Sequence, residues 1–157
     1  MLEISPLLKS DLASNSVPVT YLLHIEQNQK TFYIATKGME FDGNIYEDRN
    51  LTISNLKERV NIKDRSWSIN SANIRLSNAP VNTKRFSSLL DWQGGNDILN
   101  CVVKILIYTP SCENINDCLI IYTGRIVDCK TNSDIITIKT EDSFDEYIKE
   151  RHFPFAK

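Results

Sequence analysis

The stretch from Val19 to Ala35, which reads VTYLLHIEQNQKTFYIA, decides the fold class of this chain. Apolar residues occupy every second position from Val19 to Ile25, which is the period of a half-buried β-strand. Residues 27–29 are polar and predict a turn. Residues 31–35 are rich in aromatic and β-branched side chains and predict a second strand that pairs back on the first. The chain therefore begins its folded part with a predicted β-hairpin.

The same kind of signal continues immediately after this hairpin. In the stretch Phe41-Asp42-Gly43-Asn44-Ile45-Tyr46, Asp-Gly lies between apolar residues. This predicts a tight hairpin, because a two-residue primed turn requires positive φ angles that glycine adopts easily. Residues 51–62 and 65–76 predict two further strand segments. The apolar phase of the second segment changes near Ser71, which indicates a β-bulge or a strand that crosses between faces.

Strand alternation returns at residues 101–107, 120–122 and 136–138, and Gly124 predicts a bend within its strand. Capping residues and apolar spacing predict short helices near Pro6–Leu12, Phe86–Leu90 and Ser143–Lys149. Short strands without a βαβ rhythm predict a mainly antiparallel β fold, a barrel or a sandwich, with a few short helices. We expect an N-terminal arm or short helix at 1–16, a β-rich domain at 17–150 and a C-terminal tail at 151–157.

Composition excludes several function classes. The chain has 157 residues and a formal net charge of −2, so its bulk charge does not favour binding to nucleic acid. No apolar run approaches the ~20 residues that span a bilayer, and the N-terminus lacks the pattern of a secretory signal. We therefore expect a chain that is made and kept in a cytosol and has no membrane partner.

The chain contains no motif typical of an active site or a cofactor site, so we expect no enzymatic activity and no cofactor. Both histidines, His24 and His152, lack motif context and are interpreted as packing or surface residues. Two alternatives stay open. A small hydrolase could use paired carboxylates such as Glu40 and Asp42. An OB-like module could bind single-stranded nucleic acid through interleaved basic and aromatic residues. The candidates for that module are Lys30, Tyr33, Lys37, Arg65 and Trp67, of which Trp67 fits a core position better.

Cys112 and Cys118 flank the polar segment 113–117 between two predicted strands. Free thiols and a disulfide both stay open for this pair. A zinc site would need two further ligands, and no second pair has the spacing of metal ligands. We predict that this loop faces solvent, binds no metal and is not catalytic. Cys101 and Cys129 fall in strand patterns and are interpreted as small buried apolar residues.

The order of several segments resembles the N-terminal domain of bacteriophage tail and baseplate hub proteins, in particular those of marine tailed phages. The stretch Tyr122-Thr123-Gly124-Arg125-Ile126 is similar to a strand of that family with the pattern tyrosine, any residue, glycine, basic residue, apolar residue. The polar Cys112–Cys118 loop is similar to another of its segments. The remaining similar segments are Phe32–Thr36, Phe41–Glu47, Leu51–Glu58, Trp67–Asn78, Ile136–Ile138 and Glu141–Asp142.

This resemblance implies a fold like that of tail-tube subunits and a mechanical function. Such domains assemble as homo- or hetero-oligomeric rings around a channel, which DNA crosses only in transit. The implied partners are neighbouring tail or baseplate proteins, and the implied location is the virion tail, with the host cytoplasm during assembly. Hairpin tips project to where a partner can reach them. We therefore expect subunit contacts at the two predicted tips, through Asp42, Gly43, Asn44, Cys112, Asn114 and Cys118.

Overall fold

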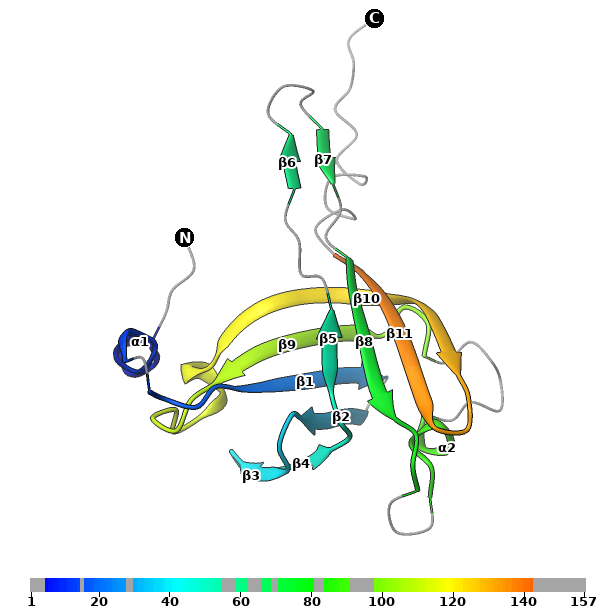
Figure 1. Cartoon of the computed structure of the whole chain (residues 1–157), viewed down its shortest axis with the longest axis horizontal. Coiled ribbons are helices and arrows are strands. Elements are labelled where there is room, and N and C mark those ends of the chain that lie inside the picture. Colours follow the sequence, from blue (N-terminus) through cyan, green and yellow to red (C-terminus); the bar gives the residue numbers. More distant parts are fainter. Residues whose placement is uncertain are drawn as a thin grey trace, which may run out of the picture.

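The computed structural model describes residues 5–14, 16–27, 30–54, 59–61, 66–68, 71–80, 84–90 and 98–142, with the backbone alone for 59–61 and 66–68. Eleven strands and a few short helical segments make up this part of the chain (Figure 1). The helical segments are α1 (Pro6–Ala13), α2 (Phe86–Leu89) and the 3-10 turn η2 (Ile115–Asp117). The strands are β1 (Thr20–Gln27), β2 (Lys30–Ala35), β3 (Met39–Phe41), β4 (Asn44–Asp48), β5 (Thr52–Ser54), β6 (Arg59–Asn61), β7 (Ser66–Ser68), β8 (Ser71–Ser77), β9 (Val102–Tyr108), β10 (Leu119–Thr131) and β11 (Ile135–Asp142).

Nine of these strands form one sheet in the order β3-β4-β2-β1-β9-β10-β11-β8-β5. All neighbours are antiparallel except β2 and β4, which run parallel over two residue pairs. The mainly antiparallel β class is therefore confirmed. The sheet is not closed into a barrel, because among the described residues no ladder joins the edge strands β3 and β5. The sequence predicted a barrel or a sandwich, and the prediction of a closed barrel is wrong.

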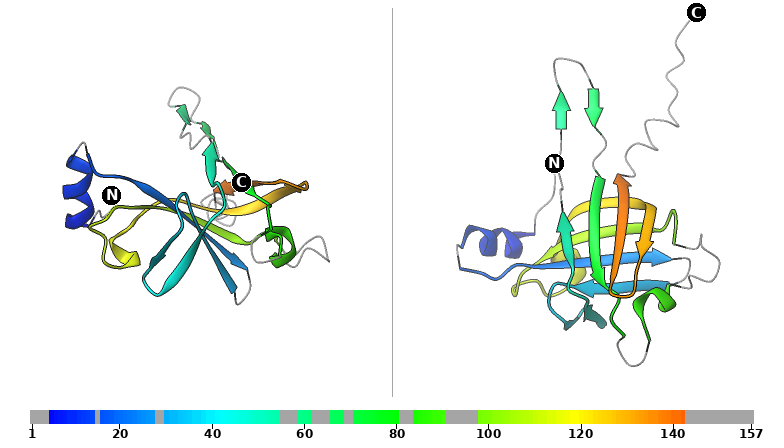
Figure 2. Two further views of the ribbon diagram at one scale, coloured as in Figure 1. Left: turned by 60° about the horizontal axis from the view of Figure 1, so that its bottom comes forward. Right: turned by 45° about the vertical axis from the view of Figure 1, so that its right-hand side comes forward.

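The sheet curls over itself, so that β8 and β11 cross the direction of β1 and β2 (Figure 2). The long strand β10 produces this curl, because its register shifts once between Ile120 and Tyr122 and again between Ile126 and Asp128. Each shift adds a residue to one strand and bends it. Gly124 lies between the two shifts, as the sequence predicted for a bend.

The curl encloses one hydrophobic core, here called the inner core. It is built from alternate residues of both halves of the sheet and from α2, with Leu23, Ile25, Ile34, Ile74, Phe86, Leu90, Val103, Ile105, Ile126, Ile136 and Ile138 among its members. A second cluster, the outer core, covers the opposite face of β1, β2 and β9. It consists of Leu8, Leu22, Ala35, Phe41, Tyr46, Leu106, Cys112 and Cys118. Strand β1 is consequently buried on both faces along most of its length.

The two strand segments predicted at 51–62 and 65–76 contain the four described strands β5, β6, β7 and β8. Strands β6 and β7 pair with each other in a separate two-stranded ladder that stands apart from the curled sheet (Figure 1). Strand β8 begins at Ser71, where the apolar phase of the sequence changes, and it belongs to the main sheet. The helices predicted at Pro6 and Phe86 are confirmed as α1 and α2. The helix predicted at Ser143–Lys149, the side chain of Trp67 and His152 lie outside the described residues.

In the described part of the chain, neither α1 nor any other helix has the length and apolar character needed to cross a membrane.

Candidate functional site

The first predicted tip is the turn between β3 and β4. Asp42 and Gly43 both have positive φ angles, 49° and 72°, which is the backbone geometry of a primed two-residue turn. Asn44 donates its side-chain amide to the carbonyl oxygen of Asp42 at 3.1 Å. The Asp-Gly signal in the sequence therefore led to the correct turn, and the turn exposes Asp42 and Gly43.

The second predicted tip is the loop between β9 and β10, and it holds itself in shape. The side chain of Asn114 accepts a hydrogen bond from the backbone N–H of Asn116 at 3.0 Å. The carboxylate of Asp117 accepts from the N–H groups of Glu113 and Asn114, each at 3.1 Å. These bonds form a capping box around η2. The polar side chains of Asn114 and Asp117 therefore accept hydrogen bonds from backbone N–H groups of the same segment.

The structure brings the two tips together. The backbone N–H of Ile115 donates to the carboxylate of Asp42 at 3.1 Å, across a separation of 73 residues. The loop is also tied to α1, because Ser111 donates both its N–H, at 3.2 Å, and its hydroxyl, at 2.8 Å, to the carboxylate of Asp11. Hydrogen bonds from Thr109 and Ser111 lower the pKa of Asp11. Three separate segments thus form one surface at the same end of the molecule (Figure 1).

The expectation that the whole loop faces solvent is wrong for its cysteines. Glu113, Asn114 and Asn116 are exposed, but the side chains of Cys112 and Cys118 are only 5% and 8% exposed. They turn inward because the outer core needs apolar groups beneath the loop, where they pack with Phe41 and Tyr46. Asp42, Gly43 and Asn114 therefore remain available to a partner, and the two sulfur atoms do not.

A pocket of about 540 Å³ opens between the two tips. Its floor includes His24, whose Nε2 lies 2.8 Å from the Tyr46 hydroxyl and whose ring packs edge-on against Tyr33. Burial lowers the pKa of His24 to about 4, with the positive charge of Lys104 adding to the effect and Glu26 opposing it. His24 is therefore neutral at neutral pH, in agreement with the predicted packing role. Its partners come from other strands, which strand periodicity cannot reveal.

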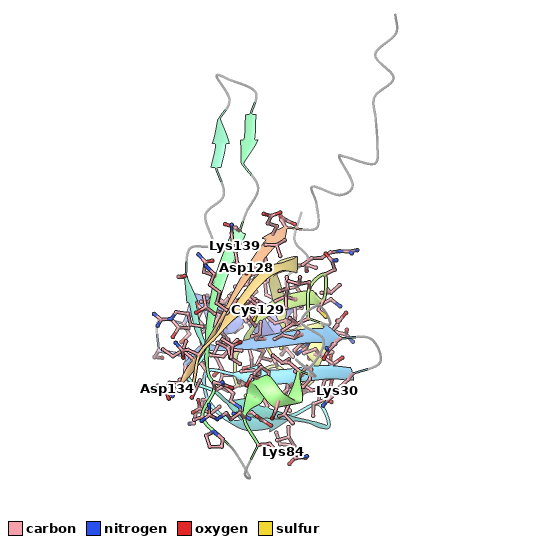
Figure 3. All side chains as sticks on the ribbon, turned by 90° about the vertical axis from the view of Figure 1, so that its right-hand side faces the viewer. Lys30, Lys84, Asp128, Cys129, Asp134 and Lys139 are labelled. Atoms are coloured by element: carbon pink, nitrogen blue, oxygen red, sulfur yellow. The ribbon has the colours of Figure 1, made fainter. Side chains whose placement is uncertain are left out.

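Among the candidates for nucleic-acid binding that the structure describes, Lys30 and Tyr33 lie on opposite faces of β2. Lys30, at the end of β2 that Figure 3 labels, places its ammonium 4.5 Å from the centre of the Phe32 ring. Tyr33 points to the opposite side of β2 and packs against Tyr46 in an edge-on arrangement. The side chains of Arg65 and Trp67 lie outside the described residues. The described candidates thus form no aromatic platform of the kind that single-stranded nucleic acid uses.

The two carboxylates considered for a hydrolase lie in the edge strand β3 and in the turn that follows it. The carboxylate of Asp42 accepts a hydrogen bond from the backbone N–H of Ile115, and Glu40 is exposed on the edge strand β3. None of the four cysteines, Cys101, Cys112, Cys118 and Cys129, forms a disulfide in this structure. Within the described ranges, no three histidine, cysteine or acidic side chains meet closely enough to hold a metal ion.

Comparison with known proteins adds a likeness of fold. No family model and no curated protein sequence matches the chain. Among solved structures, the chain is similar to a chain in the virion of a native gene transfer agent (GTA) particle, with a TM-score of 0.63 and 10% sequence identity. The match covers 87% of this chain and 44% of that chain. This chain therefore spans less than half the length of its structural neighbour, and the likeness concerns the fold.

Proposed function

We propose that the chain is a non-enzymatic structural subunit of a bacteriophage-like virion, in a hub- or tube-like position of the tail or baseplate. It acts by assembling with neighbouring subunits into a ring, which DNA crosses only in transit. The fold likeness to a chain of a gene transfer agent virion supports the virion class. The resemblance of the strand segments to tail hub proteins supports the position within the tail.

The observation that carries this proposal is the hydrogen bond between Asp42 and Ile115. It joins two tips that are remote in sequence into one solvent-facing surface. A surface that is already ordered loses little conformational entropy when a partner binds, which favours a structural contact. Because the tips carry Asp42, Asn44 and Asn114, the proposed contact is polar at its rim. The partly exposed side chain of Ile120 lines the pocket between them.

The two ends of the sheet support assembly in a second way. Strands β3 and β5 each pair with one neighbour only among the described strands. A strand edge presents unpaired backbone groups that another chain can extend, which makes it a ready assembly surface. The β6–β7 ladder, which stands apart from the sheet, offers a further element for contact with a neighbour.

Hydrogen exchange tests the contact assignment. We expect the amides of residues 38–48 and 110–119 to exchange more slowly in assembled particles than in free subunits. The buried strand β1 serves as an internal reference that changes little. Identification of the chain by mass spectrometry of purified virions is the first step, and its absence from virions would end the proposal. If the chain is present but both segments exchange at the same rate in the two forms, the contact assignment is wrong.

A pair of charge reversals sharpens the same test. Glu113 is exposed on the second tip, and Lys139, which Figure 3 labels, is exposed on β11, a strand that belongs to neither tip. We expect Glu113→Arg to lower incorporation into particles and Lys139→Glu to leave it unchanged, with both free subunits folded. Equal incorporation of the two variants would contradict the assigned surface. Salt-dependent binding of the free subunit to single-stranded DNA would favour the nucleic-acid-binding alternative.

A further inference from the structure

The β3–β4 hairpin presents a different surface on each of its two faces. Side chains alternate along a strand, so Asn44 and Tyr46 lie on one face of β4 and Ile45 lies on the other. Tyr46 is buried in the outer core. Ile45 is 74% exposed, the highest value for a large apolar side chain among the residues that the structure describes. One exposed isoleucine is ordinary on a protein surface, so its surroundings decide what it can do.

A carboxylate accompanies this exposed isoleucine. Glu40 lies directly opposite Ile45 in the β3–β4 ladder, and residues that are opposite each other project from the same face of a sheet. Glu40 is exposed as well. Strand β3 ends the order of the described sheet, so the pair lies at its margin (Figure 1). We call the side chains of Ile45 and Glu40 the knob, because they form an apolar projection with a negative charge beside it.

The pocket between the two tips has the complementary character. Its apolar lining includes Ile120, which is 45% exposed. Its cation is Lys104, whose side chain is 35% exposed and whose ammonium lies 2.6 Å from Glu26. An ammonium group has three N–H donors, so the bond to Glu26 leaves capacity for a second carboxylate. Asp42, the acidic residue of the lining, already accepts a hydrogen bond from the other tip.

We propose that this pocket receives the knob of a second copy of the chain, with Ile45 inside the pocket and Glu40 beside Lys104. The inference rests on the proposed assembly of subunits and names the partner for the surface at the two tips. Ile45 gains free energy when it leaves water for an apolar lining, and the pair of opposite charges fixes its orientation. The pocket volume of about 540 Å³ leaves room for residues that flank Ile45 in the second hairpin.

The knob and the pocket lie on opposite faces of one hairpin, which determines the kind of assembly. A copy that has inserted its knob into a neighbour still offers its own pocket to a third copy. A head-to-tail contact of this kind closes into a ring if the rotation between copies allows it and otherwise continues as a filament. A two-fold dimer would instead need both contacts between the same two copies.

Engineered cysteines test the contact directly. Full chains with Ile45→Cys are mixed with full chains with Ile120→Cys at millimolar concentration and oxidised with copper phenanthroline. We expect a disulfide between the two chains, since such a bond needs Cα atoms within about 7 Å. Val127→Cys is the matched control, because Val127 is 39% exposed on the same strand and does not line the pocket. A mixture of Ile45→Cys with the unmodified chain gives the background from the native cysteines.

Sedimentation velocity tests the two parts of the knob. We expect Ile45→Ser to weaken self-association by about tenfold, because one large apolar side chain no longer leaves water. Glu40→Lys and Lys104→Glu are each expected to weaken it, and the double variant E40K/K104E is expected to associate more tightly than Lys104→Glu alone. The lost pair with Glu26 is common to those last two proteins, so it does not affect their comparison. Thermal melting of each variant confirms that it is folded.

The outcomes separate this contact from the proposed function. The double variant I45C/I120C is expected to form a ladder of linked chains, and a product limited to dimers would overturn the head-to-tail order. Cross-linking of Ile45→Cys to Ile120→Cys that is no greater than to Val127→Cys overturns the proposal and leaves the pocket to a different partner. Protection of both tips in particles without this cross-link rejects the contact alone. The cross-link in a chain that is absent from virions rejects the virion function alone.

Discussion

The imidazole of His24 lies on the outer face of β1, where the strand partners on both sides determine its chemistry. It pairs across the sheet with Tyr33 on β2 and with Lys104 on β9, and it is 8% exposed. Burial disfavours the charged form, so the pKa falls from its ordinary value of 6.5 to about 4.

This shift predicts how stability depends on pH. Between pH 6.5 and pH 4 the unfolded chain takes up a proton on His24 that the folded chain does not, so stability is complete above pH 6.5 and is lost as the pH falls toward 4. The contribution is at most roughly 3 kcal/mol. Urea unfolding at a series of pH values measures it. We expect the variant His24→Gln, which can still bond to Tyr46, to show a flatter profile in this range. Parallel profiles of the two proteins would contradict the assignment.

Gly124 in β10 leaves room for the carbonyl oxygen of Glu141 and the hydroxyl of Tyr122. A Cβ atom at this position would lie 2.5 Å from the carbonyl oxygen of Glu141 and nearer still to the Tyr122 hydroxyl, which bonds to Thr140 at 2.8 Å. At Gly38, in contrast, the nearest atoms would lie 3.6 Å away. We expect Gly124→Ala to cost about 1–3 kcal/mol of unfolding free energy, because a paired backbone cannot move aside. Gly38→Ala is the matched control, and equal costs in urea unfolding would show that Gly124 meets no clash.

The β3–β4 hairpin is an element that depends on its turn. Gly43 has a φ of 72°, and a Cβ added there would meet nothing within 4 Å. Any cost of substitution therefore comes from the backbone conformation and not from contacts. We expect Gly43→Ala to destabilise the protein by about 1 kcal/mol and Gly43→Asn by less, because asparagine tolerates positive φ angles. Chemical denaturation of the two variants separates these values, and an alanine variant as stable as the asparagine variant would refute the argument.

Arg49 contacts residues from several separate parts of the chain. Its side chain is 2% exposed and places two nitrogens at 2.6 and 2.7 Å from one oxygen of Glu47. A third nitrogen donates to the carbonyl oxygen of Ala79 at 2.8 Å, and the guanidinium lies 5.2 Å from the centre of the Phe86 ring. The carbonyl oxygen of Arg49 accepts from the N–H of Ser77 at 2.6 Å. One residue thus connects the β4–β5 link, the end of β8 and α2.

These contacts use three nitrogens of one planar guanidinium group. We therefore predict that Arg49→Lys lowers the free energy of unfolding. A lysine keeps the charge but cannot reach the carboxylate and the carbonyl together, which leaves a buried charge poorly paired. We expect a loss of about 2–4 kcal/mol in unfolding free energy, against less than about 0.5 kcal/mol for Arg75→Lys on the exposed side of β8. Similar losses for both variants in guanidinium unfolding would contradict this role of Arg49.

The local structure was predictable from the residues themselves. The alternation in Val19–Ala35 led to the β1–β2 hairpin, and Asp42-Gly43 led to a turn with two positive φ angles. Pro6 correctly marked the start of α1. These predictions succeed because strand period, turn conformation and helix capping are properties of residues that are neighbours in sequence. The mainly β class of the fold follows from their sum.

Contacts between distant residues decided the rest. Asp42 meets Ile115 across 73 positions, Arg49 meets Ala79 across 30, and Cys112 and Cys118 turn inward because the outer core lies beneath them. Whether the sheet would close into a barrel depended on how far the shifts in β10 bend it, which no single segment encodes. Pairing and burial of this kind arise when separate strands pack against each other. The order of the sheet, the joining of the two tips and the protonation of His24 were therefore set by the tertiary structure, while the strands and turns were set by the sequence.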